Sequence, residues 1–381
     1  MNLFDVYPLF NIEPVKGLGC KVWDKEGNEY LDLYGGHAVI SIGHSHPRYV
    51  RGLQEQTAKL GFYSNSVEIP QQIELAQKLG DLSGYPDYSL FLCNSGAEAN
   101  ENALKLASFH TGRKKIIACK NSFHGRTSLA VEITDNQKIQ APVNHTGNVV
   151  FIDLDDTAAL ERELKGEEAA AFIVEGIQGI AGIYEPSAGF LQEASALCKR
   201  YGTVLILDEI QSGYGRTGRF FAHQYAGIKP GLITLAKGMG NGFPVGGVMI
   251  GPEFKASHGL LGTTFGGSHL ACAACIAVLD VMKEEDLIGQ AGEAGKMLLE
   301  ALGEIPGVKE VRGKGLMIAV ELEGSVKEIR SSLLFDHKIF TGSAKSPNVL
   351  RLLPPLCISK EDCSKFVAVF KEVMIKQEQH G

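Results

Sequence analysis

Short, mostly apolar runs alternate with longer amphipathic stretches through the middle of the chain. The runs have the length of buried strands and lie at residues 90–92, 115–118, 149–152, 171–174, 204–207 and 232–235. Between them, residues 98–109 and 191–200 have the apolar spacing of helices. Apolar strands separated by helices are typical of a mostly parallel sheet with helices on both faces. The pattern therefore predicts a large α/β domain, which we place at residues 47–265.

The last third of the chain has a different pattern. Apolar residues recur at helical spacing at Leu287, Ala291, Ala294, Leu298 and Leu302. Residues 316–322 and 349–353 have the character of strands. Ser359, with Asp362 three residues later, is a start signal for a final helix that carries Phe366, Phe370 and Val373. We expect a smaller α+β domain at residues 266–381, with residues 1–46 packed against it.

Composition and charge exclude several classes of protein. The 37 Lys and Arg against 44 Asp and Glu give a net charge of −7, whereas a protein held to nucleic acid by phosphate contacts usually has a basic excess. Hydrophobic residues at 44% and charged residues at 21% are ordinary for a folded globular chain. No apolar run approaches the ~18 residues of a membrane span. We expect neither a nucleic acid nor a membrane as a partner.

The eight cysteines are spread along the chain and form no dense framework, which fits a reducing compartment. The first residues have neither the basic segment nor the apolar stretch of a signal peptide. We therefore expect a cytoplasmic protein.

Three short motifs suggest ligands but lack the context that each ligand needs. Gly213–Gly218 matches G-x-G-x-x-G, yet it does not directly follow a strand as a dinucleotide-binding loop should. His44–Pro47 contains two histidines, and Cys272 and Cys275 have C-x-x-C spacing, but neither has the second ligand pair of a zinc site. We expect no metal, a turn into a helix at the histidines, and an apolar helix around the cysteines.

Polar residues at the ends of two predicted strands and at one turn indicate a cofactor. Asp208 closes the run 204–207, at the edge where open α/β sheets bind ligands. Lys237 follows the run 232–235 and can form a Schiff base with an aldehyde, while a nearby acid can keep a pyridine nitrogen protonated. Small residues at 95–97 let backbone N–H groups reach a phosphate at a helix start. Each signal alone is weak, since a strand-end acid is often only solvated, but together they indicate pyridoxal phosphate.

The sequence also resembles the class III, ornithine-type aminotransferases, and within them the acetylornithine and succinylornithine aminotransferases, almost from end to end. The resemblance rests on blocks at residues 22–32, 43–47, 95–101, 123–127, 208–213, 236–238 and 264–267. It implies the fold-type I architecture of pyridoxal-phosphate enzymes, with a mostly parallel seven-stranded sheet between helices and a smaller α+β domain. It also implies a homodimer with active sites at the subunit interface.

The resemblance assigns roles around the cofactor. Lys237 would bind the cofactor aldehyde and then act as the general base, and Asp208 would pair with the pyridine nitrogen, so these two would be catalytic. Gln211 would donate to the phenolic oxygen and Phe123 would stack on the ring. The phosphate would be held by Ser95, Gly96 and Ala97, and Thr264 would reach the phosphate of the partner subunit's cofactor.

The resemblance also assigns substrate contacts. Arg126 would grip the α-carboxylate of an acylornithine or the distal carboxylate of glutamate, and Arg351 would take the α-carboxylate of glutamate. A guanidinium suits both tasks because it meets a carboxylate with two parallel hydrogen bonds. Thr263 would lie beside the substrate. The implied reaction, a step of arginine biosynthesis, moves the δ-amino group of N-acetyl- or N-succinylornithine to 2-oxoglutarate and gives glutamate and an N-acylglutamate 5-semialdehyde.

Several alternatives stay open. One is another class III ω-aminotransferase, acting on ornithine or 4-aminobutyrate, although the short chain and the full motif set suit acylornithine better and those enzymes are usually longer. A glutamate-semialdehyde-type aminomutase would keep the cofactor but usually has another residue at Gln211. A non-catalytic protein on this fold is disfavoured because Lys237 and Asp208 are retained. The acyl group itself is left open between acetyl and succinyl.

One loop departs from the family pattern. Related enzymes have Gln-Gly-Glu after the position of Glu175, and that last Glu is thought to pair with the glutamate-binding arginine. This chain has Gln178, Gly179 and Ile180 there, and Gly176 stands where proline is usual. We hypothesise that Arg351 is not masked from within this loop.

An Ile180→Glu variant tests that hypothesis. The new carboxylate should compete for Arg351 and weaken the glutamate half-reaction, which is measured by the rate at which glutamate converts the cofactor. Unchanged glutamate kinetics would contradict the hypothesis.

Overall fold

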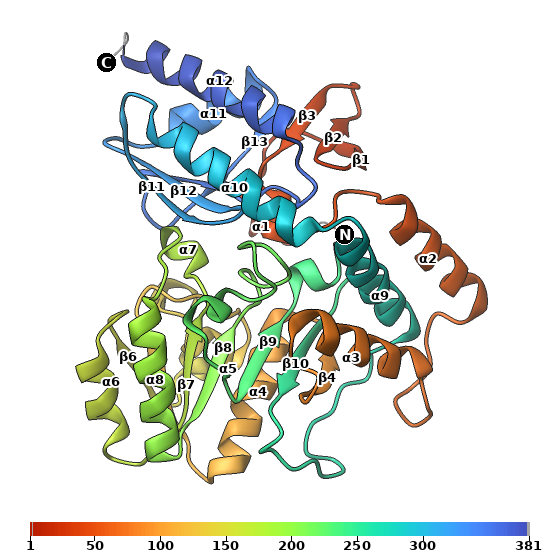
Figure 1. Ribbon diagram of the computed structural model, residues 1–381, viewed down its shortest axis with the longest axis vertical. Helices are drawn as coiled ribbons and strands as arrows, with labels where there is room; N and C mark the ends of the chain where they lie inside the picture. Colours follow the sequence, from red (N-terminus) through yellow and green to blue (C-terminus); the bar gives the residue numbers. More distant parts are fainter. Residues whose placement is uncertain (2, 379–381) are drawn as a thin grey trace.

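A seven-stranded sheet forms the centre of the lower part of the molecule in Figure 1. The computed structural model describes Met1 and residues 3–378 of the 381. The order of the strands across the sheet is β4 (Ser89–Cys93), β10 (Gly246–Ile250), β9 (Leu232–Leu235), β8 (Val204–Asp208), β7 (Ala169–Glu175), β5 (Lys115–Cys119) and β6 (Val149–Ile152). The strands from β9 to β6 are parallel, and β10 runs antiparallel to both neighbours. The predicted mostly parallel sheet is confirmed.

Strand β10 is the one strand of this sheet that the apolar pattern did not predict. It begins with Gly246 and Gly247, and glycine is a weak strand former. A Cβ at Gly246 would lie 2.5 Å from the carbonyl oxygen of Ser95, so a larger residue there would displace the turn that follows β4. Close packing at that turn, rather than strand propensity, accounts for the glycine.

Helices cover both faces because alternate strand residues point to opposite sides. On β5, Ile116 and Ala118 pack in the core with α4 (Gly96–Thr111), whereas Ile117 and Cys119 pack in the core with α6 (Thr157–Leu164) and α8 (Ala188–Tyr201). Figure 1 shows α6 and α8 side by side on their face of the sheet. The short helices here are α5 (Ser128–Glu132), η1 (Gln137–Ile139), η2 (Pro142–Asn144), α7 (Gly179–Gly182), η3 (Ala222–Ala226) and η4 (Lys237–Met239).

Three further helices pack together at the right of Figure 1: α2 (Pro47–Lys59), α3 (Pro70–Ser83) and α9 (His269–Glu284). Helix α2 starts as predicted, with the His46 side chain accepting the N–H of Arg48 and proline in the first turn. Cys272 and Cys275 lie fully buried on α9, as expected for small residues of an apolar helix. Their burial accounts for the pair without a metal.

The upper part of the molecule holds two small four-stranded sheets (Figure 1). One consists of β11 (Val308–Lys314), β12 (Met317–Leu322), β15 (Val349–Leu352) and β14 (Gly342–Ser343), all antiparallel, with α10 (Leu287–Gly303), α11 (Lys327–Phe335) and α12 (Lys360–Glu378). The other combines β1 (Pro14–Leu18), β2 (Lys21–Asp24) and β3 (Glu29–Asp32) with β13 (Ile339–Phe340). Because β13 pairs with β3, strands from the two ends of the chain share one sheet. The boundaries at 46/47 and 265/266 stay a prediction.

The last helix begins where the sequence predicts, but one of the two expected hydrogen bonds between Ser359 and Asp362 is replaced by another. The Ser359 hydroxyl accepts the N–H of Asp362 at 3.0 Å, but the Asp362 carboxylate accepts from that hydroxyl at 2.7 Å rather than from the Ser359 N–H. Phe366, Phe370 and Val373 are all buried. Among the helices of the described chain, none is both long enough and apolar enough to cross a bilayer.

A single buried arginine joins three parts of the fold. Arg216, 2% exposed, follows β8 in a loop of the large domain. Its guanidinium donates to the carbonyl oxygens of Leu316 and Pro354, on either side of the β12–β15 pair, and to that of Ile40 in the N-terminal segment. Burial lowers the pKa of Arg216 to about 10, so the group is still charged at neutral pH. The hydrogen bonds to these three carbonyls replace those that the Arg216 guanidinium would make with water.

Asn241 fixes the loop after β9 to the N-terminal segment. Its buried amide accepts the N–H groups of Ser41 at 2.8 Å and Ile42 at 3.1 Å, and donates to the carbonyl of Gly43 at 3.0 Å. One side chain therefore satisfies three backbone groups about 200 residues away in sequence.

Asn241→Ala should lower the free energy of unfolding by about 2–4 kcal/mol, because it leaves buried N–H groups without acceptors. Urea unfolding measures this loss. Asn136→Ala is the control, since its exposed side chain accepts one hydrogen bond within the described chain, from the nearby N–H of Lys138, and it should cost less than about 1 kcal/mol. Equal losses in the two variants would contradict the assigned role of Asn241.

Candidate active site

Three charged side chains meet where neighbouring parallel strands end. Glu175 is the last residue of β7 and lies beside Asp208, the last residue of β8. Asp208 in turn lies beside Thr234 of β9, and Lys237 comes three residues later. Since parallel strands present their carboxyl ends at one edge of a sheet, the topology itself gathers two acids and a lysine.

The carboxylate of Asp208 is held by three donors. Oδ2 accepts from Nδ1 of His124 at 2.7 Å and from Nδ2 of Asn100 at 2.8 Å, and Oδ1 accepts the N–H of Ile210 at 3.0 Å. The carboxylate is therefore fixed in orientation while buried. No role was predicted from the sequence for His124 or Asn100, although both lie within the blocks that carry the family resemblance.

Glu175 ties two loops of the site together. Its Oε1 accepts the N–H of Phe123 at 3.1 Å, and its Oε2 accepts the N–H of Gly179 at 3.0 Å. Burial, reinforced by the nearby charge of Asp208, raises the pKa of Glu175 to about 7. No role was predicted from the sequence for Glu175, although its place at the end of an apolar strand was an available signal.

Lys237 is half-buried and has a left-handed backbone, with φ of 47°. Burial lowers the pKa of its amine, and the positive charge of Arg351 acts in the same direction, while Asp208 and Glu175 oppose both. A lysine with a lowered pKa has more of the neutral amine that acts as nucleophile or base. The Ser41 hydroxyl donates to the carbonyl of Gly238 at 2.7 Å and so helps to fix this turn.

Residues 95–97, at the start of α4, are suited to bind an anion; we call this turn the anion seat. Ser95 caps the helix, its hydroxyl accepting the N–H of Glu98 at 3.2 Å, and the first N–H groups, those of Gly96 and Ala97, have no acceptor within the helix. A Cβ at Gly96 would lie 2.9 Å from Ile210. Gly125 has φ of 144°, and a Cβ there would lie 2.9 Å from that of Ala97. Side chains at Gly96 and Gly125 would therefore obstruct the backbone that lines the anion seat.

Two predicted contact residues have polar atoms without partners. Gln211 donates from Nε2 to the carbonyl of His37 at 3.1 Å, but its Oε1 is buried and unpaired. Arg351, 3% exposed, donates from Nε to the carbonyl of Ser343 at 2.5 Å, while its Nη1 is unpaired. It forms no ion pair within the described residues, and burial lowers its pKa. A buried guanidinium without a counter-ion is suited to an anionic ligand.

The remaining predicted residues, Arg126, Thr263 and Thr264, form no hydrogen bond with Lys237, Asp208 or Arg351 within the described chain. Arg126 is exposed and has no hydrogen bond or ion pair in the part of the chain that the structure describes. The Thr263 hydroxyl accepts from Nδ2 of Asn94 at 3.2 Å and from the N–H of Gly266 at 3.2 Å, at the wall of a cavity of about 290 Å³ that Lys237 does not line. Thr264 is exposed.

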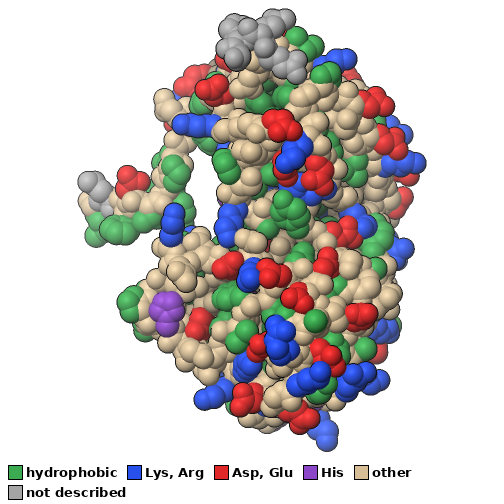
Figure 2. All heavy atoms as spheres, turned by 90° about the vertical axis from the view of Figure 1, so that its left-hand side faces the viewer, with side chains coloured by type: hydrophobic (Ala, Val, Ile, Leu, Met, Phe, Trp, Pro, Cys, Tyr) green, Lys and Arg blue, Asp and Glu red, His purple; other side chains and the backbone are tan. Residues whose placement is uncertain are grey.

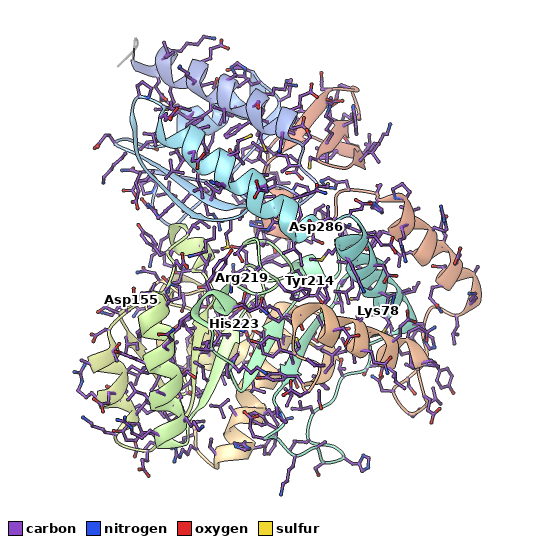
Figure 3. The ribbon with its side chains drawn as sticks, in the orientation of Figure 1. Lys78, Asp155, Tyr214, Arg219, His223 and Asp286 are labelled. Atoms are coloured by element: carbon purple, nitrogen blue, oxygen red, sulfur yellow. The ribbon has the colours of Figure 1, made fainter. Side chains whose placement is uncertain are left out.

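A second buried network holds the segment directly after Asp208, at the end of β8, in place. Glu209 points away from the site, and its carboxylate accepts from Ser212 at 2.6 Å and contacts Nδ1 of His223 at 2.7 Å. Nε2 of His223 (labelled in Figure 3) contacts the hydroxyl of Tyr85 at 2.6 Å. Because every group in this network is paired, it stiffens the segment that carries Asp208 without presenting a free polar atom to a ligand.

The geometry fits pyridoxal phosphate. Buried polar atoms without protein partners occur on residues around Lys237, namely Asn100, His124, Gln211, Thr234 and Arg351. Such orphaned groups are costly unless a ligand or water satisfies them. An amine, an opposing carboxylate and a helix-start anion seat match an aldehyde, a pyridine nitrogen and a phosphate. Within residues 1 and 3–378, no group of three or more His, Cys, Asp or Glu side chains is placed to hold a metal ion.

The raised pKa of Glu175 predicts a pH-dependent stability. A carboxyl whose pKa is about 7 in the folded protein and about 4.5 in the unfolded chain loses stabilisation as pH rises between those values. In the cofactor-free protein, Glu175→Gln should gain stability relative to the parent between pH 5 and pH 8, by on the order of 2–3 kcal/mol. Urea unfolding across this pH range measures the difference.

Glu193→Gln is the matched control, because Glu193 is exposed on α8 and has no hydrogen bond or ion pair within the described chain. Its stability difference from the parent should not change with pH. A pH-independent difference for Glu175→Gln as well would contradict the raised pKa.

The chain matches known proteins over nearly its whole length. The model of the aminotransferase class-III family matches residues 5–374. An acetylornithine aminotransferase of Bacillus cereus is 40% identical over 380 residues, which cover 98% of this chain and 97% of the relative. An acetylornithine aminotransferase of Archaeoglobus fulgidus is 39% identical over 371 residues, 97% of each chain.

Solved structures agree with these matches. An ornithine aminotransferase from Toxoplasma gondii superposes with a TM-score of 0.92 at 32% identity, over 98% of this chain and 93% of that one. An acetylornithine aminotransferase from Elizabethkingia anophelis gives a TM-score of 0.85 at 33% identity, over 97% and 95%. The predicted fold and family are both confirmed: this chain is a class III aminotransferase.

Proposed function

We propose that this aminotransferase uses pyridoxal phosphate to move the δ-amino group of N-acetylornithine to 2-oxoglutarate, giving glutamate and N-acetylglutamate 5-semialdehyde in arginine biosynthesis. The observation that carries the proposal is the meeting of Lys237 and Asp208 at one sheet edge, near a buried Arg351 that lacks a counter-ion. The names of the relatives, acetylornithine aminotransferases, favour the acetyl over the succinyl substrate.

Each part of the cofactor has residues suited to it. Ser95, Gly96 and Ala97 would hold the phosphate, Asp208 the pyridine nitrogen and Gln211 the phenolic oxygen, with Phe123 against the ring. When bound, the cofactor supplies an aldehyde that takes up the amino group and a ring that withdraws electrons from the substrate carbon. Three hydrogen bonds keep Asp208 aimed in one direction, so the ring would meet a preorganised charge.

Lys237 would supply the proton transfers. Burial lowers the pKa of its amine, which favours the neutral form that can remove the proton from the amine-bearing carbon of the donor. The ammonium formed in this way would then donate the proton again later in the reaction. The fixed turn around Gly238 keeps the amine at the strand end throughout.

Two arginines would distinguish the two substrates. Arg351, buried and with an unpaired Nη1, would bind the α-carboxylate of glutamate or 2-oxoglutarate with two hydrogen bonds. Arg126 would hold the carboxylate of N-acetylornithine or the distal carboxylate of glutamate, and Thr263 would lie beside the substrate.

A homodimer would complete the site. Thr264 is exposed, and Phe265 next to it is 63% exposed, as expected for residues that reach a second subunit. The first ten residues expose large apolar side chains, with Leu3 at 98% and Phe4 at 91%, on a segment that stands away from the body of the molecule (Figure 2). Apolar surface of this kind favours a protein partner, here a second copy. We place the dimer in the cytoplasm.

A titration of the purified holoenzyme tests the proposal. The absorbance of the aldehyde form of the cofactor should give way to that of the amine form on adding N-acetylornithine, and 2-oxoglutarate should reverse the change. N-succinylornithine, ornithine and 4-aminobutyrate are titrated in parallel. Lys237→Ala is the control, and its conversion should slow by about 10²–10⁴, the usual contribution of a general base.

The alternatives give different results. Conversion by ornithine or 4-aminobutyrate in preference to N-acetylornithine would overturn the substrate, and preference for N-succinylornithine would change the acyl group. Turnover without added 2-oxoglutarate would indicate an aminomutase. A purified protein that takes up no cofactor would overturn the roles of Lys237 and Asp208.

A further inference from the structure

Two cysteines from opposite ends of the chain meet sulfur to sulfur. The Sγ atoms of Cys20 and Cys357 lie 3.7 Å apart, although the two residues are 337 positions apart in the sequence. Cys20 and Gly19 form the turn between β1 and β2, whereas Cys357 lies in the turn that leads from β15 towards α12. The contact therefore joins the N-terminal sheet to the C-terminal part of the chain.

Residues 41–44 hold both turns in place. Gly19 and His44 exchange two backbone hydrogen bonds, of 3.0 and 2.8 Å. The N–H of Leu356 donates to the carbonyl of Ser41 at 2.7 Å. Because each turn is bonded to the same short segment, the backbone sets the position of one thiol relative to the other.

Gly43 leaves the space in which the two turns approach each other. A Cβ at residue 43 would lie 2.8 Å from Sγ of Cys357 and 3.0 Å from Cα of Gly19. The φ of Gly43 is 94°, in the region that glycine adopts without strain. A side chain at this position would push the Cys357 thiol away, so the close approach of the turns depends on its absence.

The two thiols differ in their access to solvent. Cys20 is 6% exposed, and its Sγ lies 3.9 Å from the carbonyl oxygen of Pro355. Cys357 is half-buried. A small oxidant in solution therefore reaches the sulfur of Cys357 first, while the sulfur of Cys20 is in contact with it.

The hydrogen bond between the thiols gives them different reactivity. It lowers the pKa of Cys357, which burial opposes, and together with burial it raises the pKa of Cys20. The thiolate is the form of cysteine that attacks an oxidant, so Cys357 is the nucleophile of the pair. Once the sulfur of Cys357 is oxidised it is no longer an anion, and the largest cause of the raised pKa of Cys20 is lost.

The other cysteines of the described chain do not offer this arrangement. They are all buried, and burial raises the pKa of Cys93, Cys198 and Cys272 to about 12. Within residues 1 and 3–378, Cys20 and Cys357 are the one pair of thiols joined by a hydrogen bond. The same residues contain no group of three or more His, Cys, Asp or Glu placed to hold a metal ion, so the pair is not part of a metal site.

We propose that a peroxide oxidises Cys20 and Cys357 to a disulfide, which links the β1–β2 turn to the C-terminal part of the chain. The Cys357 thiolate attacks one oxygen of hydrogen peroxide, the O–O bond breaks, and the sulfur becomes a sulfenic acid while the hydroxide takes up a proton and leaves as water. The Cys20 sulfur then displaces the hydroxyl of the sulfenic acid, and a second water leaves with the proton of Cys20. Two thiols lose two electrons in total, and one peroxide is reduced to two waters.

The fold accommodates the bond without a change at the active site. The sulfurs have to approach from 3.7 Å to about 2.05 Å, and both lie on turns, where side-chain rotation and a small backbone shift bring them together. Neither cysteine is among the residues assigned to the cofactor or the substrates. Because the bond spans 337 positions of sequence, it restricts the unfolded chain much more than the folded one. In a reducing compartment such a bond is transient, and a dithiol reverses it.

Thiol counting on the purified holoenzyme tests the proposal. The reduced chain has eight thiols, and hydrogen peroxide should lower the number that reacts in denaturant by two, which dithiothreitol should restore. Mass spectrometry of a digest made without reductant should find the peptides of Cys20 and Cys357 joined, and the chain should run as a monomer on a denaturing gel. Eight remaining thiols, a bond between other cysteines or a linked dimer would overturn the proposal.

Variants of individual cysteines test the order of the two steps. Cys20→Ser should stop at the sulfenic acid, which dimedone traps on Cys357, and Cys357→Ser should form neither product at these positions. Cys363→Ser is the control, because it removes a buried thiol of α12 and should leave the disulfide unchanged. Trapping on Cys20 rather than on Cys357, or a disulfide in either of the first two variants, would contradict the assigned steps.

Unfolding in urea measures the consequence for the fold. At equal protein concentration, the oxidised parent should reach its midpoint about 1 M above that of the reduced parent, because the bond restricts the unfolded chain. Cys20→Ser treated with peroxide in the same way should show no rise. Equal midpoints for the oxidised and the reduced parent would mean that the bond does not hold the two ends of the chain together, and that part of the proposal would be wrong.

Discussion

The site depends on the hydrogen bonding of one buried carboxylate. Asp208 lies buried at the end of the central strand of the large sheet, where an unpaired charge would be strongly unfavourable. His124 and Asn100 meet the same oxygen from two different segments, so placing this charge also places the loop after β5 and the first turns of α4. That arrangement therefore also positions Phe123, next to His124, and the anion seat at the start of α4.

Much of the fold is predictable because it is local. Six strands of the large sheet are apolar runs in the sequence, and the residue that ends such a run lies at the ligand-binding edge. Asp208 and Lys237 could therefore be named from their positions alone. Strand β10 was not predictable, because its first residue, Gly246, has to leave room for the carbonyl of Ser95, a contact that periodicity does not encode.

The supporting residues were not predictable for a related reason. His124 contacts Asp208 across 84 residues of sequence, and Glu175 accepts the N–H of Phe123 across 52. Arg126, Thr263 and Thr264 belong to a different category, since no hydrogen bond within the described chain joins them to Lys237 or Asp208. Their roles came from the family resemblance, and a single subunit gives them no further support.

Arg216 has a consequence for how the molecule moves. Its charge is compensated only while the large domain, the β12–β15 pair and the N-terminal segment keep their relative positions. A swing of one part away from the others would leave a guanidinium in an apolar interior, which is a large penalty. We therefore expect these three parts to behave as one rigid frame.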